Sequence, residues 1–159
     1  MIASNTPQTV ATGHGGAYHN NLGTYGSTQD VNGNFVFSSF VMNLRKNSQA
    51  LRQASYALPI EYKKEDGTSS LGSGDRCVWI RIKGSTDNDT DYLIFSNMYT
   101  AKISFAIPAA PSGKVWKRII DTQSHFESEF NRWSDADAET MTGTYGVEPW
   151  SMVVLKALD

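Results

Sequence analysis

The spacing of apolar residues changes once along this chain, and that change limits the fold more than any other feature. Phe37, Phe40, Val41 and Leu44 recur at i, i+3, i+4 and i+7, which places them on one stripe of a helix. From residue 56 onward, apolar residues alternate with polar ones, as they do on strands with one buried face. The sequence therefore predicts a mainly β protein in which one amphipathic helix precedes the strands.

The expected helix covers residues 34–46. Asn32 and Asn34 are good capping residues at its start, because their side chains accept hydrogen bonds from free backbone N–H groups. Arg45 and Lys46 lie in the last turn, where positive charge interacts favourably with the helix dipole. Before the helix, residues 1–33 are rich in Gly, Asn, Thr and Ser and are expected to form a loop.

The remaining chain predicts roughly six to eight short strands separated by turns, the pattern of an antiparallel β-sandwich. Asp66-Gly67, for example, has the composition of a hairpin turn. The strand segments are 56–62, 77–83, 92–97, 101–107, 115–121 and 150–158. We therefore divide the chain into residues 1–53, a loop followed by the helix, and residues 54–159, an antiparallel β-sandwich domain.

Composition excludes several classes of protein. The net charge is −2 with no basic stripe, which argues against a nucleic-acid partner. No apolar run approaches the roughly 20 residues of a membrane span, so no membrane partner is expected. Cys77 is the only cysteine and lies within a strand pattern, which predicts a buried, unreactive thiol. This single cysteine and the absence of a visible signal peptide favour a cytoplasmic location.

Two groups of acidic residues resemble functional sites only superficially. Asp87-Asn88-Asp89-Thr90-Asp91 spaces oxygen ligands as a calcium loop does, but Tyr92 stands where such a loop needs glycine. We predict a solvated hairpin and no metal or other cofactor. The second group is expected to be solvated loop carboxylates rather than a glycosidase pair. It comprises Glu127, Glu129, Asp135, Asp137 and Glu139.

Aromatic side chains beside amides suit the ring faces and hydroxyls of sugars. In "GAYHNN", Tyr18 lies next to Asn20 and Asn21, a mixture that also fits any Asn-rich loop. Trp133, in a polar segment, is the tryptophan best suited to a surface role. These four residues are the candidate sugar contacts, and no catalytic residue is predicted.

Trp79 and Trp116 lie at the centres of strands, on the face opposite the Ile and Val residues. If the Ile and Val face forms the core, the two indoles pack under a neighbouring domain or lie partly exposed. Large aromatic residues that fill a sandwich core are the alternative.

Two stretches together resemble one family. The segment "NFVFSSFVMNLRKNSQALRQ" is similar to the last barrel helix of isoamylase-type and glycogen-debranching enzymes of the α-amylase superfamily. In those enzymes an aromatic-rich helix ends in Leu/Phe-Arg-Lys and is followed by Ala-Leu-Arg. The matching positions here are Leu44, Arg45, Lys46, Ala50, Leu51 and Arg52, with Ser48-Gln49 where the family usually has His-Pro.

The second stretch, residues 77–158, resembles the C-terminal β-domain of the same enzymes in the order and spacing of its segments. A strand that ends in Ile107-Pro108 is followed by a Pro/Gly turn and then by Trp116. The chain closes on "VEPWSMVVL", similar to the family's final strand.

This resemblance implies a non-catalytic C-terminal domain whose parent hydrolyses α-1,6 branch points in glycogen- or starch-type glucans. A (β/α)8 barrel needs about 250 residues, so the catalytic barrel cannot lie within this chain. The chain alone is expected to be inactive, to pack on and stabilise that barrel, and to self-associate when detached. Tyr18, Asn20 and Asn21 would align with a loop near the substrate cleft.

Two other functions remain open from the sequence. The domain is a carbohydrate-binding module that holds α-glucan through exposed aromatic residues, or it is an unrelated β-sandwich adaptor with a protein partner. Saturable glucan binding distinguishes the first of these from the structural role.

Overall fold

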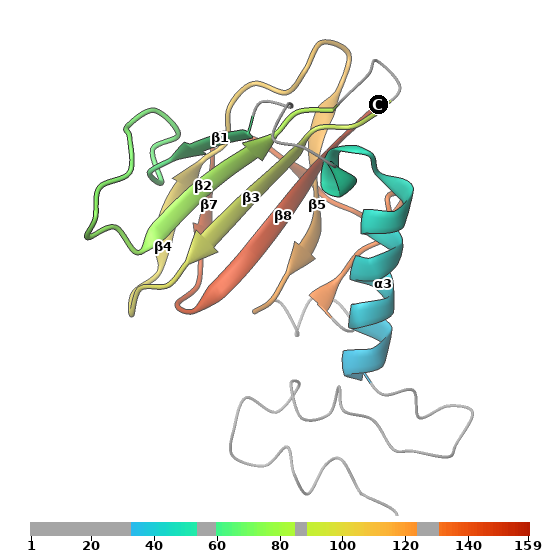
Figure 1. Ribbon diagram of the computed structural model, residues 1–159, viewed down its shortest axis with the longest axis horizontal. Helices are drawn as coiled ribbons and strands as arrows, with labels where there is room; N and C mark the ends of the chain where they lie inside the picture. Colours follow the sequence, from blue (N-terminus) through green and yellow to red (C-terminus); the bar gives the residue numbers. More distant parts are fainter. Residues whose placement is uncertain (1–32, 54–59, 85–88, 124–130) are drawn as a thin grey trace, which may run out of the picture.

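The computed structural model describes residues 33–53, 60–84, 89–123 and 131–159 (Figure 1). In this part of the chain a helix, α3 (Gly33–Asn47), and a short 3-10 turn, η1 (Ala50–Arg52), precede eight strands. The strands are β1 (Ile60–Lys63), β2 (Cys77–Ile82), β3 (Tyr92–Asn97), β4 (Ile103–Ala106), β5 (Val115–Asp121), β6 (Thr140–Met141), β7 (Thr144–Val147) and β8 (Ser151–Leu158). The prediction of a mainly β fold preceded by one helix is confirmed.

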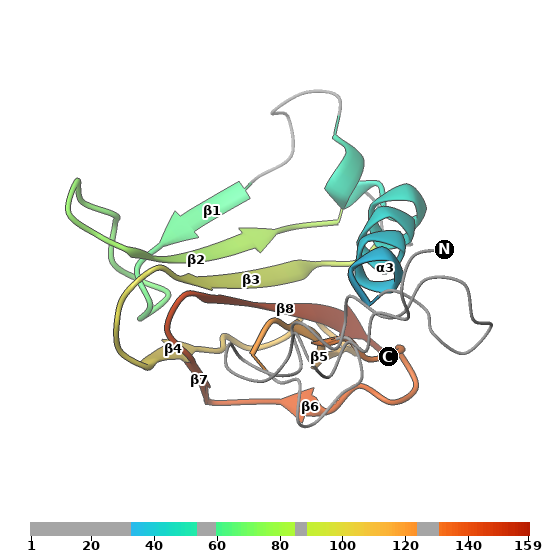
Figure 2. The same ribbon diagram turned by 90° about the horizontal axis from the view of Figure 1, so that it is seen from below.

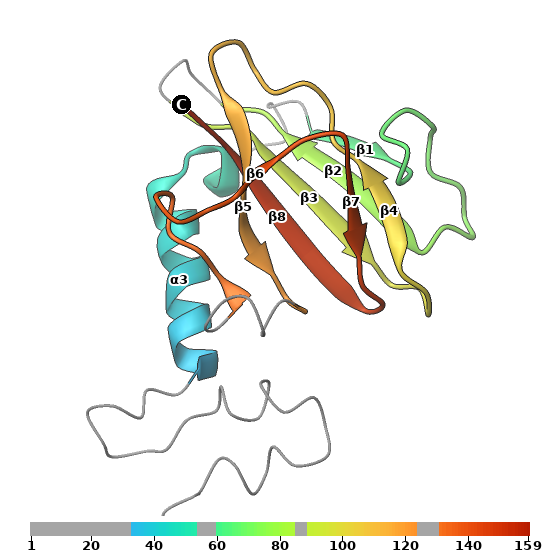
Figure 3. The same ribbon diagram turned by 180° about the vertical axis from the view of Figure 1, so that it is seen from behind.

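The strands form two antiparallel sheets of unequal size. The larger has six strands in the order β1-β2-β3-β8-β5-β6, and the smaller pairs β4 with β7. Figure 3 shows the small sheet lying across one face of the large one, which we call the inner face. Helix α3 lies on the opposite side, the outer face, beside β8 and β5 (Figure 2).

The main core lies between the two sheets. Phe95 of β3 stacks on Phe105 of β4 with their ring centroids 4.9 Å apart, which joins the sheets at their centre. Side chains at alternate positions of the large sheet supply the rest of this layer, because a strand points every second residue to the same face. These include Cys77, Trp79, Leu93, Trp116, Val153, Leu155 and Ala157, with Val147 contributed by β7.

Of the alternatives for Trp79 and Trp116, the structure shows the one in which they fill the sandwich core, so the expectation of a partly exposed face or of packing under a neighbouring domain is wrong. Both indoles are 2% exposed and belong to the inner core. The Trp79 Nε1–H donates to the carbonyl of Ala106 at 2.9 Å, and the Trp116 Nε1–H donates to that of Pro108 at 3.0 Å. The large rings fill the space between the sheets while their single polar groups remain hydrogen-bonded, so burial leaves no donor unsatisfied.

A second apolar cluster holds the helix against the outer face. Phe37, Phe40 and Leu44 of α3 pack against buried residues of the sheet that include Tyr92 and Ile119. Val41, which the sequence assigns to the same stripe, is 38% exposed, so the contact is narrower than predicted. The helix extends over Gly33–Asn47, one residue longer at each end than expected.

A register shift in β5 between Arg118 and Ile120 changes which side chains point outward. In a regular strand, residues three apart point to opposite faces. Here Arg118 pairs with Leu155 and Asp121 with Val153, two inner-face positions, so both charged side chains point inward. Ile119 and Ile120 both join the helix-side cluster. One extra residue thus supplies an inward ion pair and two outward apolar side chains.

Other boundaries differ modestly from the predictions. The first strand begins at Ile60, and residues 56–59 of the predicted segment 56–62 lie outside the described residues. Strands β6 and β7 lie between the predicted segments 115–121 and 150–158 and were not predicted. The division between residues 53 and 54 stays a prediction, since residues 54–59 are not described. Among the described residues, no helix is long and apolar enough to cross a membrane.

The assignment of faces predicts different costs for two neighbouring truncations in β3. Leu93→Ala removes a fully buried inner-core side chain and should cost about 2–5 kcal/mol of unfolding free energy. Ile94→Ala acts on the half-buried outer face and should cost less than about 1.5 kcal/mol. Urea unfolding of both variants measures the difference. Equal costs, or a larger cost at Ile94, would contradict the assignment.

Candidate functional site: the outer face of the large sheet

The outer face of β1, β2, β3 and β8 carries a continuous set of apolar side chains. The strand registers align Tyr62 with Ile80 and Ile80 with Ile94, and they align Ile94 with Val154. Val78 of β2 and Met152 of β8 lie two residues from members of this row, on the same side of it, and Ser96 of β3 pairs with both of them. We call the six apolar residues of this set the apolar patch.

The patch is only partly covered. Tyr62 is 54% exposed and Met152 is 38% exposed, while Val78, Ile80, Ile94 and Val154 are half-buried. The helix lies over the β8 and β5 side of this face, and β1 and β2 lie away from it (Figure 2). Removing apolar surface of this kind from water, by contact with another apolar surface, lowers the free energy of the system. The patch is therefore suited to association.

The helix adds exposed apolar side chains of its own. Met42 is 72% exposed and Val41 38% exposed, on the part of α3 that does not contact the sheet. The Arg132 guanidinium lies 5.4 Å from the centre of the Phe40 ring, which adds a contact between the helix and the segment paired with Ile120. The helix is thus fixed to the domain, while its side that carries Val41 and Met42 remains free to contact another surface.

The carboxylates suggested as a calcium loop hold the chain together instead. Asp89 accepts a hydrogen bond from the Ala50 backbone N–H at 2.7 Å, which anchors η1 to the turn before β3. Asp91 forms an ion pair with Arg81 at 3.0 Å and accepts the Gly84 backbone N–H at 2.9 Å. These bonds use the oxygens that a cation would need, so the two carboxylates act as structural anchors.

The described members of the acidic group are exposed, as predicted. Asp135 forms an ion pair with Lys156 at 2.6 Å, and Asp137 accepts the Ser134 hydroxyl at 2.5 Å. Glu139 lies 3.4 Å from the buried Arg118. Glu127 and Glu129 lie outside the described residues. Within the described ranges no three His, Cys, Asp or Glu side chains are grouped closely enough to hold a metal ion.

Cys77 is the buried thiol that the sequence predicts. It is 8% exposed, belongs to the inner core, and donates to the Asn97 side-chain oxygen at 3.4 Å. Burial, together with the nearby charges of Glu65 and Asp75, raises the pKa of the thiol. The raised pKa disfavours the reactive thiolate, which supports a structural role.

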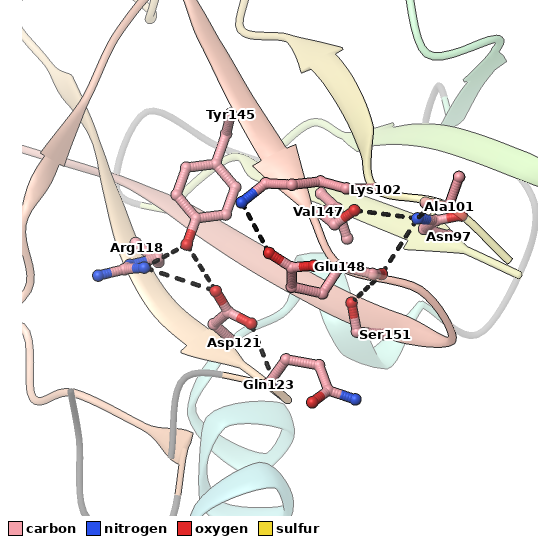
Figure 4. A network of polar contacts seen from close by, with 10 residues as sticks. All are labelled: Asn97, Ala101, Lys102, Arg118, Asp121, Gln123, Tyr145, Val147, Glu148 and Ser151. Atoms are coloured by element: carbon pink, nitrogen blue, oxygen red, sulfur yellow. Dashed lines mark hydrogen bonds and ion pairs between the residues drawn. The ribbon is translucent and has the colours of Figure 1, made fainter. Parts of the chain in front are cut away.

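A polar cluster connects β5 to β7 inside the sandwich (Figure 4). Arg118 is 3% exposed and Asp121 6% exposed, with 3.5 Å between the guanidinium and the carboxylate. The Tyr145 hydroxyl donates to Asp121 at 2.6 Å and accepts a hydrogen bond from Arg118. Because Tyr145 belongs to the small sheet, these bonds join the two sheets where the apolar core ends.

Trp133, a predicted sugar contact, lies against this cluster. The Arg118 guanidinium lies 4.4 Å from the Trp133 ring centre and 5.2 Å from that of Tyr145, so the cation is held between two aromatic side chains. Trp133 is half-buried and also packs against the helix-side cluster. Tyr18, Asn20 and Asn21 lie outside the described residues.

The structure also exposes an aromatic residue that is not among the four predicted sugar contacts. Trp150 is 59% exposed and has a φ of 56°, in the left-handed region that large side chains rarely adopt. It follows Pro149 in the turn before β8, where a type II turn normally takes glycine or asparagine after proline. Such a conformation costs on the order of 1–3 kcal/mol. The sequence signal that could have indicated this exposed residue is a tryptophan directly after a proline in a turn.

The buried cluster predicts a large effect of removing one charge. Asp121→Asn leaves Arg118 without its buried counter-charge and should cost about 3–5 kcal/mol of unfolding free energy. Glu61→Gln, at an exposed ion pair with Lys83, should cost less than about 1 kcal/mol and serves as the control. Chemical denaturation measures both, and a cost at Asp121 no larger than at Glu61 would contradict this role.

Alkaline pH should weaken the same cluster. Burial, reinforced by the hydrogen bond to Asp121 and by its charge, raises the pKa of Tyr145 above the ordinary value of 10.0. Above about pH 10 the unfolded chain therefore releases a proton that the folded chain keeps, and stability falls as pH rises. Tyr145→Phe should show a shallower fall in melting temperature between about pH 9 and 11. A slope identical to that of the unchanged chain would refute this linkage.

Comparison with known proteins identifies the domain. The family model described as isoamylase, C-terminal, matches residues 62–156, which is more than half of the chain. No curated protein matches the sequence closely enough to be compared with it. The match begins in β1 and ends in β8, so it covers both sheets of the sandwich. The chain therefore belongs to the isoamylase C-terminal family, the β-domain of isoamylase-type glycoside hydrolases.

Proposed function

We propose that this chain is the non-catalytic C-terminal domain of an enzyme that debranches α-1,6 links in glycogen- or starch-type glucans. Its task is to pack on the catalytic (β/α)8 barrel and stabilise it. The observation that carries this proposal is the apolar patch, with Tyr62 and Met152 exposed at its margins. An apolar sheet face that remains uncovered in a family of C-terminal domains fits contact with the domain that precedes it.

The topology supports a role without catalysis. All pairs of strands in the described residues are antiparallel, whereas a (β/α)8 barrel is built from parallel strands. A retaining glycosidase also needs two carboxyl groups about 5 Å apart beside the sugar. The inward-pointing carboxylate Asp121 is instead bound to Arg118 and Tyr145 inside the sandwich. We expect no glucan hydrolysis by this chain alone.

Helix α3 extends the proposed docking surface. It packs on the outer face through Phe37, Phe40 and Leu44, and it exposes Val41 and Met42. If this helix is the last of the barrel, as its resemblance implies, its free side faces the neighbouring barrel helices. The sugar contacts predicted at Tyr18, Asn20, Asn21 and Trp133 remain proposals, as does the binding of α-glucan by this domain.

A detached domain with an uncovered apolar patch should self-associate, and a charge within the patch should prevent this. Ile94→Lys places an ammonium group at the centre of the outer face, and the oligomer detected by light scattering should shift to monomer. Ser104→Lys adds the same charge at an exposed position of β4 and should leave the oligomer unchanged.

The same two variants test docking. Joined in one chain to a debranching-enzyme barrel, the Ile94→Lys domain should lower the melting temperature of the barrel, and the Ser104→Lys domain should not. A chain that is monomeric at high concentration and a barrel indifferent to Ile94→Lys would together contradict the proposal. Release of reducing sugar from glycogen by the purified chain would also contradict it.

A further inference from the structure

One end of the sandwich presents aromatic rings from neighbouring turns. Asn97, the last residue of β3, pairs with Cys77 at the start of β2 and with Ser151 at the start of β8. The turn after β3 carries Tyr99, and the turn before β8 carries Trp150. Figures 1 and 3 show these two turns side by side at the same end of the large sheet.

The buried side chain of Asn97 fixes both turns. It is fully buried, and its oxygen accepts the Tyr99 backbone N–H at 2.9 Å. Its amide nitrogen donates to three backbone carbonyls (Figure 4), those of Ala101, Val147 and Glu148, at 2.9, 2.9 and 3.0 Å. The Ser151 hydroxyl also donates to the Glu148 carbonyl, at 2.6 Å. The two aromatic residues are thus held on rigid turns, which lowers the entropy lost when a ligand binds.

Trp150 is displayed at a cost to the fold. Its φ of 56° would be unstrained for glycine, yet the position holds the largest side chain, 59% exposed. Trp79 and Trp116, by contrast, have no positive φ and are buried. A strained backbone that exposes an apolar ring does not stabilise the folded chain, and strain of this kind is typical of ligand-binding positions.

Beside Tyr99 the surface is hollowed. A depression of about 440 Å³ is lined by Glu65, Gly74, Asp75, Arg76, Cys77 and Tyr99. The Arg76 guanidinium lies 6.0 Å from the Tyr99 ring centre, and Tyr99 itself is 43% exposed. Asp75 is held by Lys64 at 3.3 Å and by the Gly72 backbone N–H at 2.6 Å. The hollow therefore combines an aromatic wall with planar charged groups, of which Asp75 is held in place.

The aromatic and charged side chains of the hollow differ from those of the apolar patch, so the two surfaces suit different ligands. Contact cores between proteins are depleted in charged residues, whereas this hollow is lined by Glu65, Asp75 and Arg76. A sugar has an apolar ring face that stacks on aromatic rings and hydroxyl groups that accept and donate hydrogen bonds. Aromatic rings beside carboxylate and guanidinium groups match both requirements.

We propose that Tyr99 and Trp150 form a glucan-binding platform, with Glu65 and Arg76 hydrogen-bonding the sugar hydroxyls. The choice of α-glucan rests on the function proposed above, and the surface is separate from the apolar patch. The platform would hold a branched polymer on the C-terminal domain while another part of the enzyme acts on it.

The experiment compares glucan binding by the 159-residue chain and its variants. Maltoheptaose is titrated calorimetrically, and retardation is measured in gels that contain glycogen. Trp150→Gly should weaken binding about tenfold or more. Because glycine relieves the positive φ, the melting temperature should stay equal or rise. Trp150→Phe keeps an aromatic ring and should retain most of the binding.

Two further variants separate this proposal from the docking role. Tyr99→Ala should also weaken glucan binding. The substitution keeps the backbone N–H that Asn97 accepts, so the turn should stay in place. Tyr62→Ala removes a ring of similar exposure from the apolar patch and should leave glucan binding unchanged. Ile94→Lys, which should block docking, should likewise bind maltoheptaose normally.

Three results would overturn the platform. The first is no saturable binding of either glucan by the unchanged chain. The second is glucan binding by the Trp150→Gly and Tyr99→Ala variants that equals binding by the unchanged chain. The third is a lower melting temperature in Trp150→Gly with unchanged binding, which would make Trp150 a packing residue. If Trp150→Gly instead impairs association with the barrel, this end of the sandwich is a protein contact.

Discussion

The six-stranded sheet is apolar on both faces, and the rest of the molecule follows from how those faces are covered. The inner face is closed by the β4–β7 pair, where Phe95 stacks on Phe105. On the outer face, helix α3 covers the side near β5 and β8, and Tyr62 and Met152 remain exposed. A sheet with two apolar faces needs a layer on each side. The small sheet covers the inner face and the helix covers only part of the outer face. The apolar patch is the part of the outer face that neither element covers.

Polar residues decide how the two sheets meet. The register shift in β5 turns both Arg118 and Asp121 inward, where Tyr145 of the small sheet binds them, and it sends Ile119 outward beneath the helix. At one end of the sandwich, Asn97 joins the turn before β4 to the end of β7 through backbone carbonyls. Such hydrogen-bonded buried groups restrict the alternative ways in which two apolar sheets can slide over one another.

The sequence was sufficient for the class of fold but not for its faces. Period-two alternation located β2 and β4, because it follows directly from strand geometry, and short apolar runs between turn signals located β3, β5 and β8. Alternation cannot say which of two apolar faces lies inward, and the Ile and Val residues of β2 were therefore assigned to the core in place of Trp79. The register shift at Arg118 depends on pairing with β8, and the display of Trp150 depends on turn geometry. Neither feature can be predicted from local periodicity. The resemblance to the isoamylase family rested on the order and spacing of several segments, and it was confirmed.

The most direct measurement of the central claim is the solvent accessibility of outer-face side chains with and without a catalytic barrel. Hydroxyl-radical footprinting, read by mass spectrometry, reports the reactivity of Tyr62 and Met152 in the isolated chain and in a chain that carries the barrel before the helix. The account predicts that both side chains lose most of their reactivity in the longer chain while Trp150 stays reactive. Equal reactivity of Tyr62 and Met152 in the two chains would contradict it.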